Sequence, residues 1–124
     1  MWLRYHMAKL MVRGSKMSEL LEFVQNYSTA TDTHYHYADF TKNVENIYDG
    51  SKDTFPIEMK EQLSTLIFDM EVINGLALCD WDLASRPTEW NDWNTDYKED
   101  ADDLKKQLVS ILTGLQKEYL RILD

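Results

Sequence analysis

The chain has 124 residues, the usual length of one domain, with a formal net charge of −9 and a single cysteine. The acidic charge argues against nucleic-acid binding, because phosphate contacts need Lys and Arg side chains. A lone cysteine cannot form an internal disulfide, so Cys79 is predicted to be a reduced, structural thiol in a cytoplasmic protein. The longest apolar stretch is too short and too interrupted by polar residues to span a membrane.

The first residues differ from the rest of the chain in charge. Residues 1–16 carry +4 and no acidic side chain, so residues 17–124 carry −13. Apolar residues at helical spacing predict a short basic amphipathic helix there: Leu3, Met7, Leu10 and Met11. Such a helix can bind a membrane surface or a partner, but we favour docking on the acidic body as an ordinary first helix. We therefore divide the chain into this N-terminal helix or extension, 1–16, and a single acidic helical domain, 17–124.

Two amphipathic helices are predicted next. Ser18 is a good N-cap for the first of them, whose apolar stripe is Leu20, Phe23, Val24 and Tyr27. A polar, turn-prone run over 28–33 follows, and Asp32 or Thr33 is expected to cap the next helix. One face of that helix is apolar, with Tyr37, Phe40, Val44, Ile47 and Tyr48. Gly50 is expected to end it.

The stretch from Pro56 to Cys79 is predicted to be the central helix. Its apolar residues at helical spacing are Met59, Leu63, Leu66, Ile67, Met70, Ile73 and Ala77. A second apolar stripe consists of Phe68, Val72, Leu76 and Cys79. A helix that is apolar on two sides is expected to be covered on both. Gly75, which weakens a helix, suggests that another helix backbone comes close there.

The pattern is lost over 80–95, which we predict to be mainly irregular, before a last helix that runs to about Ile122. Asp96 and Glu99 resemble a capping box at its start. Its stripe is Leu104, Leu108, Ile111, Leu112, Leu115, Tyr119 and Ile122. The predicted fold class is all-α: a small antiparallel bundle of four main helices plus the short N-terminal helix.

Two groups of residues could bind a metal. His34 and His36 would point roughly 200° apart on a helix, so they are not expected to share an ion. The pairs Glu58-x-x-Glu61 and Glu89-x-x-Asp92 resemble the motif of all-α nucleotide pyrophosphohydrolases, and this resemblance implies a Mg²⁺-dependent hydrolase. That family's pattern needs all four carboxylates on regular, packed helices, whereas the second pair falls in the irregular segment. We therefore keep this activity as the alternative and predict no metal and no cofactor.

The most distinctive segment is 80–103, which carries −7 of the total charge and three of the four Trp residues. Tryptophan is a frequent interface anchor, and carboxylates around it would attract a basic partner. The predicted partner-binding residues are Asp80, Trp81, Asp82, Glu89, Trp90, Asp92, Trp93, Asp96 and Tyr97. In the alternative interpretation, the Trp residues cover the end of the core and the acids only favour the helix dipole.

No catalytic set is evident in this small, acidic sequence. We therefore expect an inhibitor rather than an enzyme, namely a bacterial immunity protein or antitoxin that binds and blocks a basic toxin domain such as a nuclease. Neither a nucleic acid, a membrane nor a small-molecule substrate is expected as a partner. A helical adaptor or structural protein is a further alternative.

Overall fold

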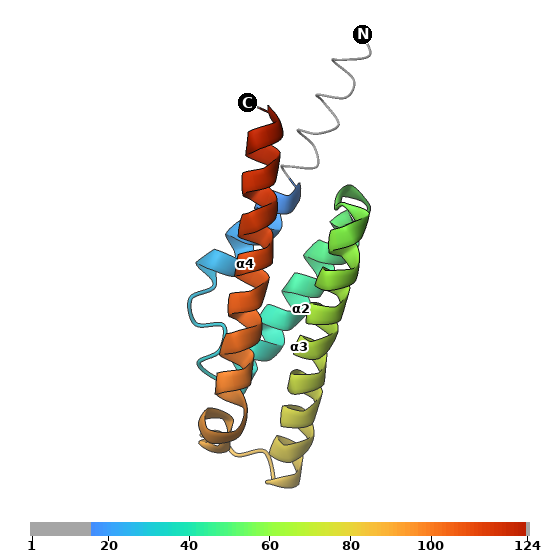
Figure 1. The fold of residues 1–124 in the computed structure, drawn as a ribbon. Coiled ribbons are helices and arrows are strands. Elements are labelled where there is room, and N and C mark those ends of the chain that lie inside the picture. Colours follow the sequence, from blue (N-terminus) through green and yellow to red (C-terminus); the bar gives the residue numbers. More distant parts are fainter. Residues whose placement is uncertain (1–15, 124) are drawn as a thin grey trace.

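The computed structural model describes residues 16–123, and within that range the chain is helical with no strand, so the fold is all-α. Residues 16–26 are helical, and the longer helices are α2 (His34–Ser51), α3 (Ile57–Leu83) and α4 (Lys98–Leu123) (Figure 1). A short 3₁₀ turn, η1 (Lys52–Thr54), precedes α3, and a π-helical turn, η2 (Trp93–Tyr97), leads into α4. No helix in the described part of the chain has the length and apolar character needed to cross a membrane. The predicted helix within 1–16 lies outside the described residues, apart from residue 16.

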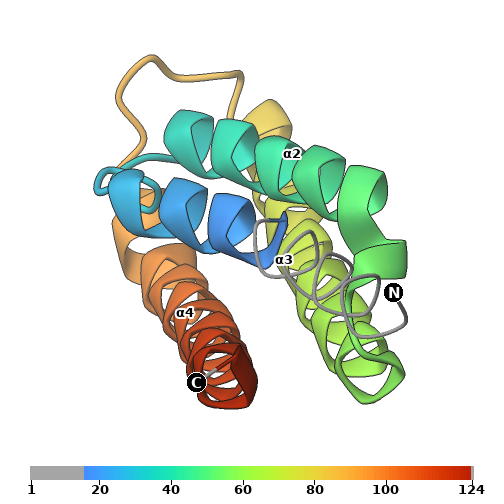
Figure 2. The same cartoon turned by 90° about the horizontal axis from the view of Figure 1, so that it is seen from above.

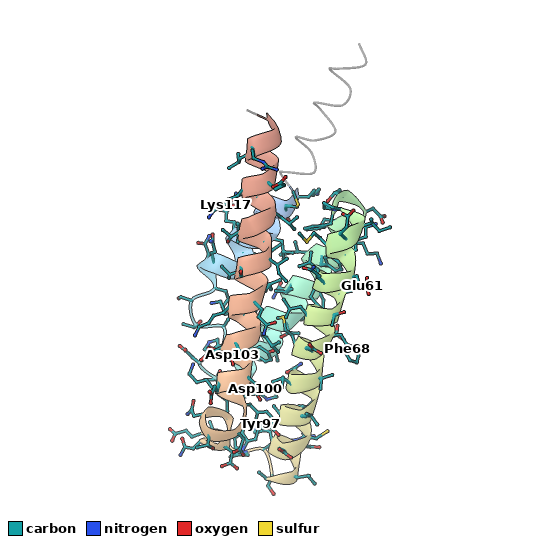
Figure 3. The ribbon with its side chains drawn as sticks, in the orientation of Figure 1. Glu61, Phe68, Tyr97, Asp100, Asp103 and Lys117 are labelled. Atoms are coloured by element: carbon teal, nitrogen blue, oxygen red, sulfur yellow. The ribbon has the colours of Figure 1, made fainter. Side chains whose placement is uncertain are left out.

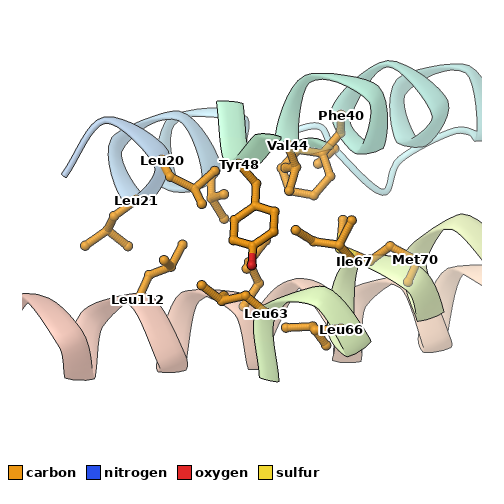
Figure 4. Packing of buried hydrophobic residues seen from close by; sticks show 14 of the residues in the cluster. Leu20, Leu21, Phe40, Val44, Tyr48, Leu63, Leu66, Ile67, Met70 and Leu112 are labelled. Atoms are coloured by element: carbon orange, nitrogen blue, oxygen red, sulfur yellow. The ribbon is translucent and has the colours of Figure 1, made fainter. Parts of the chain in front are cut away.

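The helices are arranged in two layers. Helices α3 and α4 run side by side in opposite directions, and the helical segment 16–26 lies beside α2 across them (Figures 1 and 2). The core lies between these layers (Figure 4). It contains fully buried side chains from every helix: Leu20, Val24, Tyr37, Phe40, Val44, Leu63, Met70, Leu108 and Leu112.

The first apolar stripe predicted for α3 and the described part of the stripe predicted for α4 face the core. Leu66, Met70, Leu108 and Leu112 are all at most 5 % exposed, while Ile73 is partly buried against the core. Helical periodicity found these residues because each helix has one long face turned toward the core.

Three predictions about helix ends can be tested. Thr33 does cap α2, since its Oγ1 accepts a hydrogen bond of 3.1 Å from the backbone N–H of His36. Ser18 does not cap a helix, because the chain is already helical at residue 16. Gly50 does not end α2 either: the helix continues to Ser51, whose Oγ donates a 2.6 Å hydrogen bond to the carbonyl of Ile47.

The predicted bounds and packing of the central helix need correction. Helix α3 extends one turn beyond Cys79, to Leu83. Its second apolar stripe is not covered by any described residue: Phe68 is 61 % exposed and Leu76 54 %. Only the opposite side of α3 packs on α2 and α4, which removes the reason for expecting a fully enclosed helix.

Gly75 gives a prediction about stability. A Cβ added there would meet no atom within 4 Å, so no helix backbone comes close, contrary to the expectation from sequence. Gly75→Ala is therefore expected to raise the free energy of unfolding by about 0.5–1 kcal/mol, because alanine loses less backbone entropy in a helix. Urea denaturation measures this change. A loss of stability would mean that the outer side of α3 is occupied in solution.

Candidate partner-binding surface

The candidate surface lies at the end of the molecule where α3 ends and α2 and η2 begin (Figure 1). There α3 ends in a Schellman motif: the N–H of Arg86 donates to the carbonyl of Trp81 at 3.0 Å, and that of Ser85 to Asp82 at 3.1 Å. Ser85 has φ 68° and Arg86 φ 55°, a left-handed conformation that glycine usually supplies. Because no glycine occurs here, the sequence carried no signal for this helix end.

Trp93 is a core residue. It is 1 % exposed, and its Nε1–H donates a 2.9 Å hydrogen bond to the carbonyl of Thr31. Its ring lies 5.5 Å from that of His34 and 5.4 Å from that of Tyr37. Of the two interpretations that the sequence left open for this residue, the geometry matches coverage of the core, so Trp93 offers no free surface to a partner.

Trp90 and Tyr97 lie partly buried on the outer side of Trp93. The two rings are 5.9 Å apart, and Tyr97 also lies 6.0 Å from Trp93 in a stacked arrangement. The Tyr97 hydroxyl donates a hydrogen bond to the Asp80 carboxylate at the end of α3. This bond, with partial burial, raises the pKa of Tyr97 to about 12. The hydrogen bond connects η2 to α3, and it gives Asp80, one of the predicted partner-binding carboxylates, a partner within the protein.

Trp81 holds the loop over 84–92, which follows α3, against the last turn of that helix. Its Nε1–H donates a 2.9 Å hydrogen bond to the carbonyl of Pro87, and the Arg86 guanidinium lies 5.9 Å from its ring centroid. Arg86 also forms an ion pair with Asp82 one turn earlier. Asp82 therefore has a partner inside the molecule, and the positive charge of Arg86 is largely offset.

A cavity of about 600 Å³ opens between the start of α2, the end of α3 and the loop over 84–92. Its volume is in the range of pockets that take a ligand or a large side chain. The walls include aromatic rings from α2, α3, the loop and η2: His34, Tyr35, Trp81, Trp90 and Trp93. Trp90 Nε1 is buried without a hydrogen-bond acceptor among the described residues. An unpaired buried donor costs free energy.

The remaining acids of the predicted surface are exposed. Glu89 lines the cavity, while Asp92 and Asp96 lie before and within η2. Among residues 16–123, none of these three carboxylates forms an ion pair, in contrast to Asp82. Asp96 lies inside the π-helical turn, so the predicted capping box with Glu99 is not formed.

The alternative metal site is not assembled. Glu58 and Glu61 lie in the first turns of α3, whereas Glu89 and Asp92 lie beyond its other end. Most of this 27-residue helix therefore separates the two pairs. Within the described residues, no three His, Cys, Asp or Glu side chains are close enough to bind one metal ion. His34 and His36 also have different neighbours, Asn74 Oδ1 at 2.8 Å and Thr33 Oγ1 at 3.0 Å. The two carboxylate pairs of the alternative hypothesis therefore do not come together in the described residues.

No protein-family model, curated protein or solved structure matches this chain. The predicted site residues do come together at one end of the fold, with Trp93 beneath the surface. Sequence reasoning missed most of the other residues of the cavity wall, among them His34, Leu78 and Pro87. Leu78 falls outside both apolar stripes predicted for α3, so helical spacing does not single it out.

Proposed function

We propose that this protein is a small inhibitor of the immunity-protein or antitoxin type, which binds a basic protein through the acidic, aromatic end described above. One observation carries the proposal: among residues 16–123, three carboxylates without an ion-pair partner lie at the same end of the molecule as a cavity with aromatic walls, and one of them, Glu89, lines that cavity. Glu89, Asp92 and Asp96 are these carboxylates, and Trp81 and Trp90 supply exposed parts of the wall. A toxin domain with a positively charged substrate cleft has the complementary charge.

A Lys or Arg side chain of the partner suits the chemistry of the cavity. An extended cationic side chain can lie against the faces of Trp81 and Trp90, which favour a positive charge. Glu89 and Asp32 both line the cavity and supply carboxylates for its charged group, although Asp32 also lies 3.8 Å from Lys98 Nζ. Arg86 is a cation in the same wall, but its ion pair with Asp82 offsets its charge, so it does not exclude a cationic guest.

The test is isolation of the partner. The tagged full chain is expressed in its own host, and proteins that co-purify in stoichiometric amounts are identified by mass spectrometry. We expect one basic protein whose activity falls when this chain is added. A stoichiometric partner that is acidic, or a basic one whose activity is unchanged on binding, would contradict the proposal.

The carboxylates should control the rate of association. The triple variant Glu89→Gln, Asp92→Asn, Asp96→Asn is expected to slow association with the basic partner by roughly tenfold at low salt, because steering by exposed charges raises encounter rates. The difference should shrink near physiological ionic strength, where charges are screened within about 8 Å. Surface plasmon resonance at two salt concentrations measures both effects.

A matched control removes three acids elsewhere. Glu22→Gln, Glu58→Gln, Glu61→Gln changes the net charge equally, at exposed positions away from the cavity. This variant should slow association much less. Equal slowing by both variants would show that only the overall charge matters, and that the acidic end is not the binding surface.

A further inference from the structure

The outer side of α3 presents a continuous apolar stripe that no described residue covers. Phe68, Val72, Leu76 and Leu83 are 61, 40, 54 and 84 % exposed. Their spacing, with the exposed Cys79 between the last two, places them on one face of the helix. Figure 3 labels Phe68 on α3, whose opposite side packs on α2 and α4. The stripe is about 22 Å long, four helical turns.

Acidic side chains border this stripe on both sides. At 100° per residue, Asp69 and Asp80 fall along one edge, and Glu71 and Asp82 along the other. All four are exposed, but Asp80 accepts a hydrogen bond from Tyr97 and Asp82 is paired with Arg86. Asp69 and Glu71, one on each edge, form no ion pair with any residue in 16–123 and therefore carry most of the edge charge. The one basic residue of α3 is Lys60, in its first turn, well before the stripe begins. An apolar seam between two rows of like charge is the arrangement that selects a helix partner of opposite charge.

This charge pattern argues against a second copy of the chain as the occupant. Two α3 helices packed stripe to stripe would bring acidic edges together on both sides of the contact, in either relative direction. Like charges at such positions are repulsive and disfavour the pairing.

As a helix, the protein's own residues 1–15 are too short to cover the whole stripe. Lys16, to which they are joined, lines a hollow with Gly50 and Ser51, at the end of the molecule where α3 begins. The stripe starts about 16 Å along α3 from Ile57 and ends about 39 Å along it. Fifteen helical residues span only about 22 Å, so this segment as a helix would leave the far half of the stripe uncovered.

We infer that the face of α3 from Phe68 to Leu83 binds an amphipathic helix of a partner protein, with Lys and Arg on both edges of its apolar stripe. Burial of the exposed apolar side chains would supply the affinity. The acidic edges would set the choice of partner and the orientation of its helix. This surface is distinct from the cavity, and the inference does not depend on the proposed inhibitor function.

The probe is a synthetic Leu/Lys amphipathic helical peptide of about 18 residues, long enough to span the stripe. The control peptide has the same composition in a scrambled order that forms no apolar stripe. Titration into the ¹⁵N-labelled full chain should shift the amide signals of 68–83 with the first peptide. The scrambled peptide should bind at least about tenfold more weakly.

Variants of the stripe test where the peptide binds. Val72→Asp and Leu76→Asp should each weaken binding at least about tenfold, because each places a charge in the contact. Leu120→Asp is the matched control, since Leu120 is a 57 % exposed leucine on α4. Asp69→Lys with Glu71→Lys should weaken binding while leaving the stripe apolar. Binding that is insensitive to the stripe variants would overturn the inference.

Two further results would also overturn it. A dimer by analytical ultracentrifugation that Leu76→Asp dissociates would show that a second copy covers the face. A nitroxide label on Cys79, the only cysteine, reports nearby segments of the free protein. Broadened amide signals of residues 1–15 would show that the chain's own N-terminal segment covers it. We expect a monomer and no such broadening.

Discussion

Trp93→Ala is expected to lower the free energy of unfolding by about 3–5 kcal/mol, a large share of the roughly 5–15 kcal/mol that holds a typical domain folded. The ring is 1 % exposed and lies against His34 and Tyr37. Truncation would leave a cavity at the contact between α2, η2 and α4. It would also remove the hydrogen bond to the carbonyl of Thr31, although Lys98 Nζ, 3.2 Å from that oxygen, still donates to it.

Urea denaturation measures this change, with Trp81→Ala as the matched control. Trp81 belongs to the same surface but is only partly buried, so its truncation should cost less than about 2 kcal/mol. Equal losses for the two variants would show that Trp93 is not a core anchor. Because Trp93→Ala should also impair folding, loss of binding by this variant would not identify an interface. Trp81 and Trp90 are the residues to test for partner contact.

Much of the fold could be predicted because three helices carry one regular apolar face each. Tyr37, Phe40 and Val44 on α2, and Leu108 and Leu112 on α4, are buried where the periodicity places them. Local spacing is sufficient for these residues because burial repeats with the helix period.

The two faces of α3 show what periodicity cannot decide. Leu66 and Phe68 both lie on apolar stripes, yet one is 5 % exposed and the other 61 %. An apolar side chain favours burial wherever it lies on the helix. Whether it is buried depends on which side of α3 the other helices cover. That arrangement depends on contacts between residues far apart in the chain.

The sequence predicted that the residues of the candidate site lie together, but not which of them are buried and which are exposed. Charge and aromatic content placed Trp90 and Trp93 together, and they do lie at one end of the molecule. Which of them is buried depends on η2 and on partners from α2, such as Tyr37. The segment 80–97 contains a helix end without glycine and a π-helical turn. It therefore has no simple period from which the orientation of its side chains could be predicted.

Leu66→Ala is expected to lower the free energy of unfolding by about 2–5 kcal/mol, while Phe68→Ala should change it by no more than about 0.5 kcal/mol. Leu66 faces the core, so its truncation leaves a cavity. Phe68 has no such environment among the described residues, and alanine has a somewhat higher helix propensity than phenylalanine. Both substitutions are made on one helix, two residues apart, so differences in local helix stability largely cancel. Urea denaturation of the two variants and the parent chain gives the comparison.

Repeating the urea denaturation at several protein concentrations makes this comparison more informative. If Phe68→Ala were as costly as Leu66→Ala at every concentration, a segment of the same chain would cover the outer side of α3. If its cost grew with concentration, a second copy would cover it, because association stabilises the folded state by mass action. A small and concentration-independent effect is expected, since the acidic edges that include Asp69 and Glu71 oppose self-association. The stripe would then be free in the isolated protein, which a basic partner helix requires.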